Sequence, residues 1–102
     1  MHGKLYFQMA SDLFELTGFQ RDLLYVTAGK EQPSGQRIKQ ELEQEFGEIT
    51  HGRLYPNLDT LVKKGLVRKG ERDRRTNYYQ ITDDGTSALM DRRDWEDQYI
   101  DY

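Results

Sequence analysis

The sequence HGRLYPNLDTLVKKGLVRKGERDRRTNYY, at residues 51–79, holds the strongest local pattern in the chain. Its apolar side chains recur at positions i, i+4, i+7 and i+8, namely Leu54, Leu58, Leu61 and Val62. This is the spacing of a helix that packs one face on a core, and a glycine at position 65 is placed to end it. We therefore expect a helix over residues 53–64, opened by Thr50 or His51.

The opposite side of this helix carries polar and aromatic groups. The side chains expected to point more or less outward are Arg53, Tyr55, Asn57, Thr60, Lys63 and Lys64. Cations, amides and hydroxyls are the groups that read base edges and contact phosphates in nucleic-acid complexes. Pro56 falls near the first turn, where its missing N–H costs little. This face is a candidate surface for DNA, and its alternative is an ordinary polar helix surface.

A hairpin is predicted directly after the helix. Residues 66–69 and 78–82 have the composition of strands, and the polar segment between them has the length of a hairpin tip. That tip carries the side chains of Arg72, Arg74, Arg75, Thr76 and Asn77. Composition alone favours an exposed charged loop, but on a hairpin beside the polar helix these groups become candidate DNA contacts.

Two helices are expected before this stretch. Thr17 and Gln20 form a capping box for a helix that runs to about residue 28, and Ser34 is placed to cap a second helix that runs to about residue 46. Apolar residues Ile38, Leu42 and Phe46 make a narrow stripe on the second helix. Two helices, a third helix and a hairpin predict a winged helix-turn-helix domain, mainly α with a small β-hairpin.

The last segment reads as one more helix, capped at Thr82. Aromatic and long side chains follow a stripe along it that contains Leu89, Arg92, Trp95, Tyr99 and Tyr102. This helix has little core of its own to join, so we expect the stripe to form a dimer interface with a second copy. Trp95 could also line a ligand pocket between subunits, but plain packing is the favoured interpretation.

Charge is unevenly distributed along the chain. The net charge is −3 over residues 1–49, +5 over residues 50–82 and −5 over residues 83–102, whereas the whole chain carries −3. Phosphate binding depends on the local field rather than on the overall charge. The basic segment contains the helix and the hairpin, so it remains compatible with binding DNA.

Composition limits the other classes of function. The 102 residues suit one winged-helix domain with an appended helix, and the absence of cysteine excludes disulfides and thiolate metal sites. No run of apolar residues approaches the roughly 20 needed to span a bilayer, and no signal peptide is present. We expect a cytoplasmic, nucleoid-associated protein without cofactor or metal. The sequence offers no nucleophile and base at a telling spacing, no glycine-rich phosphate loop and no set of metal ligands, so nothing in it indicates an enzyme.

The chain begins with MHGKLYFQM, in which LYFQM resembles the recognition sequence of a protease used to remove purification tags. The residues before it, Gly3 and Lys4, depart from that recognition sequence. We therefore divide the chain into a tag remnant or disordered N-terminus at residues 1–10, a DNA-binding domain at residues 11–82 and a dimerisation helix at residues 83–102.

Two motifs carry a family resemblance. GRLYPNLDTLVKKGLV at residues 52–67 and YYQITDDG at residues 78–85 resemble the hallmark helix and strands of the PadR family of transcriptional regulators. The similarity covers about residues 17–90. The segment FQRDLLY at residues 19–25 and the short acidic tail resemble small PadR-like proteins of halophilic archaea.

The resemblance implies a homodimer that pairs through its C-terminal helices and binds a palindromic operator, usually as a repressor. It also implies that Tyr55 and the start of the third helix lie at the DNA, with the wing on the backbone. Longer relatives continue past one C-terminal helix, so a small-molecule effector has no support in this sequence. The alternative function is a winged-helix module that binds proteins, which the concentration of cations disfavours.

Overall fold

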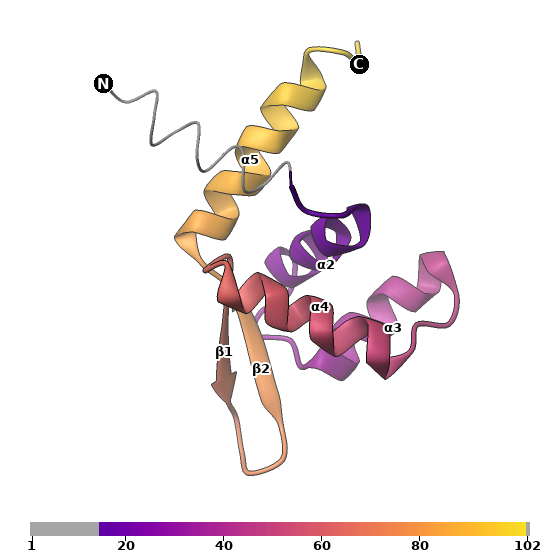
Figure 1. Ribbon diagram of the computed structural model, residues 1–102, viewed down its shortest axis with the longest axis vertical. Helices are drawn as coiled ribbons and strands as arrows, with labels where there is room; N and C mark the ends of the chain where they lie inside the picture. The colour runs from indigo at the N-terminus through magenta and orange to yellow at the C-terminus, as the bar shows by residue number, and fades with distance from the viewer. Residues whose placement is uncertain (1–14, 102) are drawn as a thin grey trace.

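The computed structural model describes residues 15–101 (Figure 1). In chain order the elements are α2 (Gly18–Ala28), α3 (Gly35–Phe46), α4 (His51–Lys63), β1 (Val67–Glu71), β2 (Asn77–Ile81) and α5 (Asp83–Asp97). The described chain is therefore mainly α with one small antiparallel hairpin, as predicted. The expectations for residues 1–10 and for Tyr102 lie outside the described residues.

Each of the four described helices begins at a hydroxyl side chain. Thr17 accepts a hydrogen bond of 3.1 Å from the backbone N–H of Gln20, whose side chain accepts one of 3.1 Å from the N–H of Thr17, so the predicted capping box is confirmed. Ser34, Thr50 and Thr82 cap the other three helices in the same way, each accepting from the N–H three residues ahead. These caps fix the starts of the helices because they satisfy amides that have no partner inside the helix.

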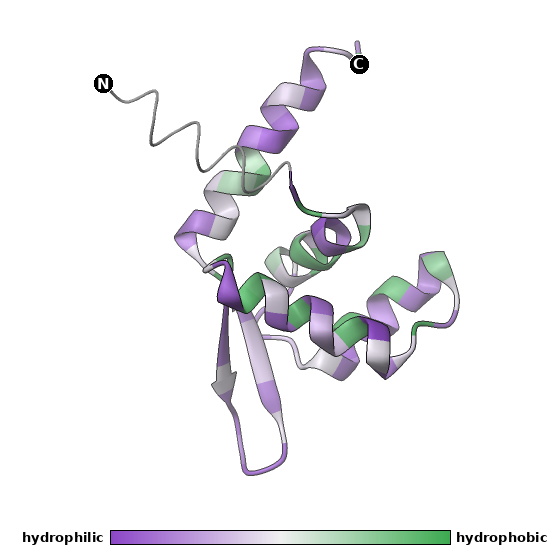
Figure 2. Cartoon of the chain, viewed as in Figure 1, coloured by the Kyte–Doolittle hydropathy of each residue, from purple (hydrophilic) through white to green (hydrophobic). Residues whose placement is uncertain are grey.

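The core lies where α2, α3 and α4 meet the base of the hairpin. It is built from Leu23, Leu24, Ile38, Leu42, Ile49, Leu54, Leu58, Leu61, Leu66, Val67 and Tyr79, together with Leu16, Ala88 and Leu89. Figure 2 shows apolar residues gathered along α2, α3 and α4, whereas the hairpin is mostly hydrophilic. Phe46, the last member of the expected stripe on α3, is 58% exposed and does not join this core.

The hairpin is longer than the sequence indicated and its tip is shorter. Its two strands pair from Val67 with Ile81 to Glu71 with Asn77, so only residues 72–76 remain in the loop. Asp73 shapes that loop, because its carboxylate accepts backbone hydrogen bonds of 2.9 Å from Arg75 and Thr76. The tight turn lets the ladder continue through residues expected in the tip.

The hairpin is also tied to the turn before α3. The backbone N–H of Tyr79 donates a hydrogen bond of 2.8 Å to the carbonyl of Pro33, and Ser34 forms an isolated β-bridge with Tyr78. The second strand thus runs against the start of α3. This contact places the base of the wing beside the helix-turn-helix unit.

Helix α5 extends away from the domain on the side opposite the hairpin (Figure 1). Its first half packs on the core, where Gly85 lies so close to the carbonyl of Leu66 that no Cβ would fit. Its second half presents large side chains to solvent, with Met90, Trp95 and the following Tyr99 and Ile100 all exposed. Within residues 15–101, no helix is both long enough and apolar enough to cross a membrane.

Candidate nucleic-acid interface

The residues expected on the outward face of α4 divide into two groups. Arg53, Lys63 and Lys64 are exposed, as is His51 at the start of the helix. Tyr55, Asn57 and Thr60 are half-buried rather than outward, and each makes contacts inside the domain. The part of α4 that is free to meet a partner is therefore narrower than the sequence pattern indicated.

Arg53 is held in place by stacking. Its guanidinium carbon lies 4.0 Å from the ring centroid of Phe19, at the start of α2. A stacked guanidinium uses its face and leaves the N–H groups at its edge available for hydrogen bonds. Arg53 is thus an oriented donor on the surface of the domain. Phe19, which also packs against the core, supplies the platform.

Asn57 is bound on both sides of its amide. Its side-chain carbonyl accepts a hydrogen bond of 3.0 Å from the side chain of Gln20, and its NH₂ group donates one of 2.7 Å to the carbonyl of Arg53. Gln20 therefore caps α2 with its oxygen and holds Asn57 with its nitrogen. The capping motif in the sequence identified Gln20, but nothing local revealed its second contact, 37 residues away.

Tyr55 lies across the first residue of α3. A Cβ added to Gly35 would lie 2.6 Å from its ring and 2.8 Å from its hydroxyl, so the ring occupies space that only glycine leaves open. The ring of His51 meets Tyr55 edge-on, with centroids 5.7 Å apart. On the same helix, the Thr60 hydroxyl donates to the carbonyl of Pro56 at 3.1 Å.

The tip of the hairpin exposes the three predicted arginines. Arg72 donates to the backbone of Gln32, whereas Arg74 and Arg75 extend from the loop shaped by Asp73. The backbone N–H groups of Arg75 and Thr76 hold the pKa of the Asp73 carboxyl below its usual range. The Asp73 carboxylate is thereby engaged by two backbone amides of the turn.

Two further cations on β1 were not among the predicted contacts. Arg68 and Lys69 are both exposed; Arg68 donates to the side chain of Gln80, and the Lys69 ammonium lies 6.0 Å from the ring centroid of Tyr79. The signal that could have found them is the net charge of the segment. Both belong to the stretch of eight Lys or Arg between residues 50 and 82.

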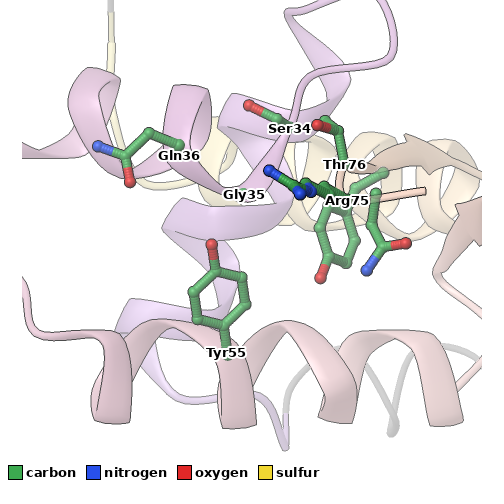
Figure 3. Close-up of a pocket in the computed structure, with 8 residues that line it drawn as sticks. Ser34, Gly35, Gln36, Tyr55, Arg75 and Thr76 are labelled. Carbon is green, nitrogen blue, oxygen red and sulfur yellow. The ribbon is translucent and has the colours of Figure 1, made fainter. Parts of the chain in front are cut away.

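A cavity of about 430 Å³ lies between the start of α3, α4 and the hairpin (Figure 3). Its lining residues are Ser34, Gly35, Gln36, Tyr55, Arg75, Thr76, Asn77 and Tyr79. The structure therefore brings together predicted contacts from α4 and from the hairpin, which are far apart in the sequence. None of the lining residues carries a negative charge.

The residues of the expected dimer stripe occupy different environments. Leu89 is only 6% exposed and belongs to the hydrophobic core, so it has little surface to offer a second copy. Trp95 is 40% exposed, and its ring meets the Tyr99 ring edge-on with centroids 5.2 Å apart. Arg92 stacks over Trp95 at 4.7 Å and bonds Glu96 at 3.1 Å.

Helix-turn-helix and hairpin together define a winged-helix domain. The family model for the transcriptional regulator PadR-like family matches residues 23–91, and the chain belongs to that family. The family consists of transcriptional regulators, so the protein is a regulator and not an enzyme. Among the described residues, no group of three or more histidine or acidic side chains could hold a metal ion.

Solved structures agree with this assignment. RosR of H. salinarum is 48% identical, with a TM-score of 0.79 over 86% of this chain and 82% of that one. The complex structure of hsRosR-S4 is 47% identical, with a TM-score of 0.84 over 92% of this chain and 84% of that one. PadR of Bacillus subtilis in complex with operator DNA shares the fold at 24% identity, with a TM-score of 0.62 over 76% of this chain and 48% of that one. No curated protein sequence matches the chain.

Proposed function

We propose that the protein binds double-stranded DNA as a homodimer and represses transcription from a palindromic operator. In this proposal α4 enters the major groove, and the hairpin lies on the backbone or in the adjacent minor groove. The observation that carries it is the shared cavity, because Tyr55 of α4 and Arg75 of the hairpin line the same space. Helix and hairpin therefore form one continuous surface.

The charge of this surface supports a polyanionic partner. Residues 50–82 hold eight Lys or Arg against three Asp or Glu, and one of those acids, Asp73, is engaged inside the hairpin turn. Exposed Arg53, Lys63 and Lys64 add to the arginines of the tip. Neutralising several phosphates at once releases counterions and supplies most of the affinity for DNA.

The contacts divide into two kinds under this proposal. The arginines at the tip, with Thr76 and Asn77, hold the backbone of the duplex and carry no sequence information. The groove is read by Arg53, which stacks on Phe19, and by the face around Asn57 and Thr60. Phosphates are contacted at the two ends of α4 by Thr50, His51, Lys63 and Lys64. Because Asn57 and Thr60 are already bonded within the domain, Arg53 is the foremost candidate for a direct base contact.

Dimerisation is proposed to use the second half of α5 in residues 83–102, beyond a DNA-binding domain at residues 11–82. The aromatic pair Trp95 and Tyr99 is exposed there, on the end of the molecule opposite the hairpin. A two-fold dimer places its two recognition helices on half-sites one turn of DNA apart, which calls for a palindrome. The fold that this chain shares with PadR of Bacillus subtilis, solved in complex with operator DNA, supports binding to DNA. A regulator of this kind would act in the cytoplasm, on the nucleoid.

A gel-shift assay on the DNA upstream of the protein's own gene tests the proposal. Affinity should fall steeply as salt rises, with higher affinity for that DNA than for random DNA of equal length. Sedimentation of the complex should give two protomers per site. A protein that binds neither DNA, but retains a folded dimer, would instead be a winged-helix module for protein partners.

A further inference from the structure

Tyr79 is a buried residue that lines the cavity between α3, α4 and the hairpin. Its side chain is 1% exposed and belongs to the hydrophobic core. Nevertheless it lines the cavity that Tyr55 and Arg75 also line. The hydroxyl of a core tyrosine at this place must therefore either bond a partner or face solvent.

The Tyr79 hydroxyl has no hydrogen-bond partner among residues 15–101. Buried tyrosine hydroxyls usually find a partner, because an unpaired polar group costs free energy when it leaves water. In the same part of the chain, no completely enclosed polar side-chain atom lacks a partner. The hydroxyl therefore keeps a small exposed area, and we assign that opening to the cavity because Tyr79 lines it.

The groups around this hydroxyl are suited to an anion. The guanidinium of Arg75 and the hydroxyl of Tyr55 border the cavity, as Figure 3 shows. The start of α3 borders it too: Ser34 accepts from the N–H of Arg37, and the backbone N–H of Gln36 has no partner within the described chain. Helix starts carry partial positive charge, so these groups act in the same direction.

Tyr79 itself stays a hydrogen-bond donor at any physiological pH. Burial, with smaller contributions from Asp59 and Tyr55, raises the pKa of its hydroxyl to about 12. A protonated hydroxyl can donate to an anionic oxygen without placing a second negative charge beside it. The same burial fixes the ring, so the donor is oriented before any ligand arrives.

We propose that this cavity binds one phosphate group, with the Tyr79 hydroxyl as its innermost donor and Arg75 and the α3 amide of Gln36 as its outer ones. The inference rests on the proposed function where the phosphate belongs to a DNA backbone. Free inorganic phosphate has the same chemistry and is the other source. In either case Tyr79 contacts the ligand directly and is more than a packing residue.

The first experiment replaces Tyr79 by phenylalanine and measures DNA affinity over a salt series. Losing a hydrogen bond to a charged oxygen should weaken binding about tenfold or more at fixed salt. The salt slope should stay unchanged because no cation is removed, whereas Arg75→Ala should lower the slope by about one unit. Tyr78→Phe removes a hydroxyl from the adjacent position on β2, outside the cavity lining, and should bind like the wild type.

Thermal unfolding of the same variants separates binding from folding. Since the Tyr79 hydroxyl has no partner in the free protein, Tyr79→Phe should be at least as stable as the wild type. A large loss of stability would show that the hydroxyl has a structural role and would overturn the proposal. The isosteric ring makes this comparison direct, because the packing of the core is kept.

The second experiment titrates inorganic phosphate into the full chain, at constant ionic strength, and follows the backbone amide of Gln36 by NMR. If DNA affinity does not depend on Tyr79 but the Gln36 amide responds to phosphate in the wild type and not in Tyr79→Phe, the site exists and its ligand is free phosphate. If neither DNA binding nor the amide depends on Tyr79, the proposal is overturned. If the wild type binds no DNA, the proposed function fails and the phosphate titration alone decides the inference.

Discussion

Arg72 at the tip of the hairpin donates a hydrogen bond of 2.6 Å to the backbone carbonyl of Gln32, 40 residues earlier in the chain. Gln32 has a φ of 45°, and among the described residues it is the one non-glycine with positive φ. Next to it, the backbone carbonyl of Pro33 accepts a hydrogen bond from the backbone N–H of Tyr79. The turn between α2 and α3 is therefore shaped so that two consecutive carbonyls hold the hairpin, and this fixes the angle of the wing.

Arg72 and Arg74 should differ as anchors, although each carries the same charge. Replacing either by alanine should lower the salt slope of DNA binding by about one unit. Arg72→Ala should also lower the affinity extrapolated to 1 M salt by severalfold, about the effect of one hydrogen bond, because the wing loses its tie to Gln32. Equal extrapolated affinities for the two variants would show that the tie does not orient the wing.

Gly35→Ala should destabilise the domain, because the new Cβ would meet the Tyr55 ring at 2.6 Å. Forcing the ring aside is expected to cost about 1–3 kcal/mol in the free energy of unfolding. Gly52→Ala is the matched control: its nearest neighbour would be the Thr50 hydroxyl at 4.0 Å, and alanine favours a helix by about 0.5–1 kcal/mol. Urea denaturation of both variants measures the difference. Similar stabilities would mean that Tyr55 moves without cost.

Gln20→Ala should reproduce much of the effect of Asn57→Ala on the choice of operator. Asn57 is oriented by Gln20, so removing either side chain leaves the same face of α4 unsupported. A lost base contact is expected to reduce discrimination between operator and mutated operator by roughly 1–3 kcal/mol. Arg53→Ala should act on the same scale. Competition binding with specific and random DNA gives this ratio, and an equal loss on both would indicate that these residues contact only phosphate.

Truncation of the chain before Asp91 should give a folded monomer in sedimentation. The cut removes Trp95 and Tyr99, the exposed aromatic pair, but keeps Leu89 in the core of the domain. Circular dichroism checks that the shortened chain keeps its helices. A truncated protein that still sediments as a dimer would exclude the second half of α5 as the pairing surface.

The hairpin turn should weaken in acid. Backbone hydrogen bonds lower the pKa of Asp73 in the folded state. Its carboxylate therefore stabilises the fold at pH values above its ordinary pKa of 3.8. That stabilisation is lost as the pH falls through the lowered pKa of the folded state. The difference in unfolding free energy between wild type and Asp73→Asn should therefore shrink as the pH drops below 3.8. A difference that is independent of pH would mean that the charge of Asp73 is not what holds the turn.

The helix starts could be predicted because their causes are local. A hydroxyl that caps a helix bonds an amide only three residues ahead, so Thr17, Ser34, Thr50 and Thr82 are visible in the sequence itself. The glycines at positions 47 and 65, both with a φ of 75°, mark where the chain turns out of α3 and α4. The hydrophobic spacing of α4 likewise depends on its own geometry alone.

Phe46 illustrates why the burial of α3 was predicted only in part. A row of residues spaced by four drifts around a helix by about 40° per step, because one turn holds 3.6 residues. Ile38 and Leu42 still face the core, but Phe46 has rotated past its edge and is exposed. The sequence also could not show that the tight turn at Asp73 would extend the strands.

The candidate site was harder to predict because its geometry comes from distant pairs. Gln20 donates a hydrogen bond to Asn57, and the Tyr55 ring lies against Gly35. Both contacts depend on how three helices pack, which no local sequence pattern reveals. Residue types and charge therefore indicated a candidate surface. They did not show which of its polar groups were already engaged inside the domain.

The opposite placement of the hairpin and α5 has a consequence for approach as well as for contact. The molecule is 45 Å along its longest axis, with the +5 segment in α4 and the hairpin and the −5 segment in α5 and the tail. Such a separation gives the protomer a large electric dipole. The electric field of a polyanion exerts a torque on this dipole, which turns the hairpin toward the polyanion and α5 away from it. The protein would thus arrive already oriented, and fewer encounters would be wasted on the wrong face.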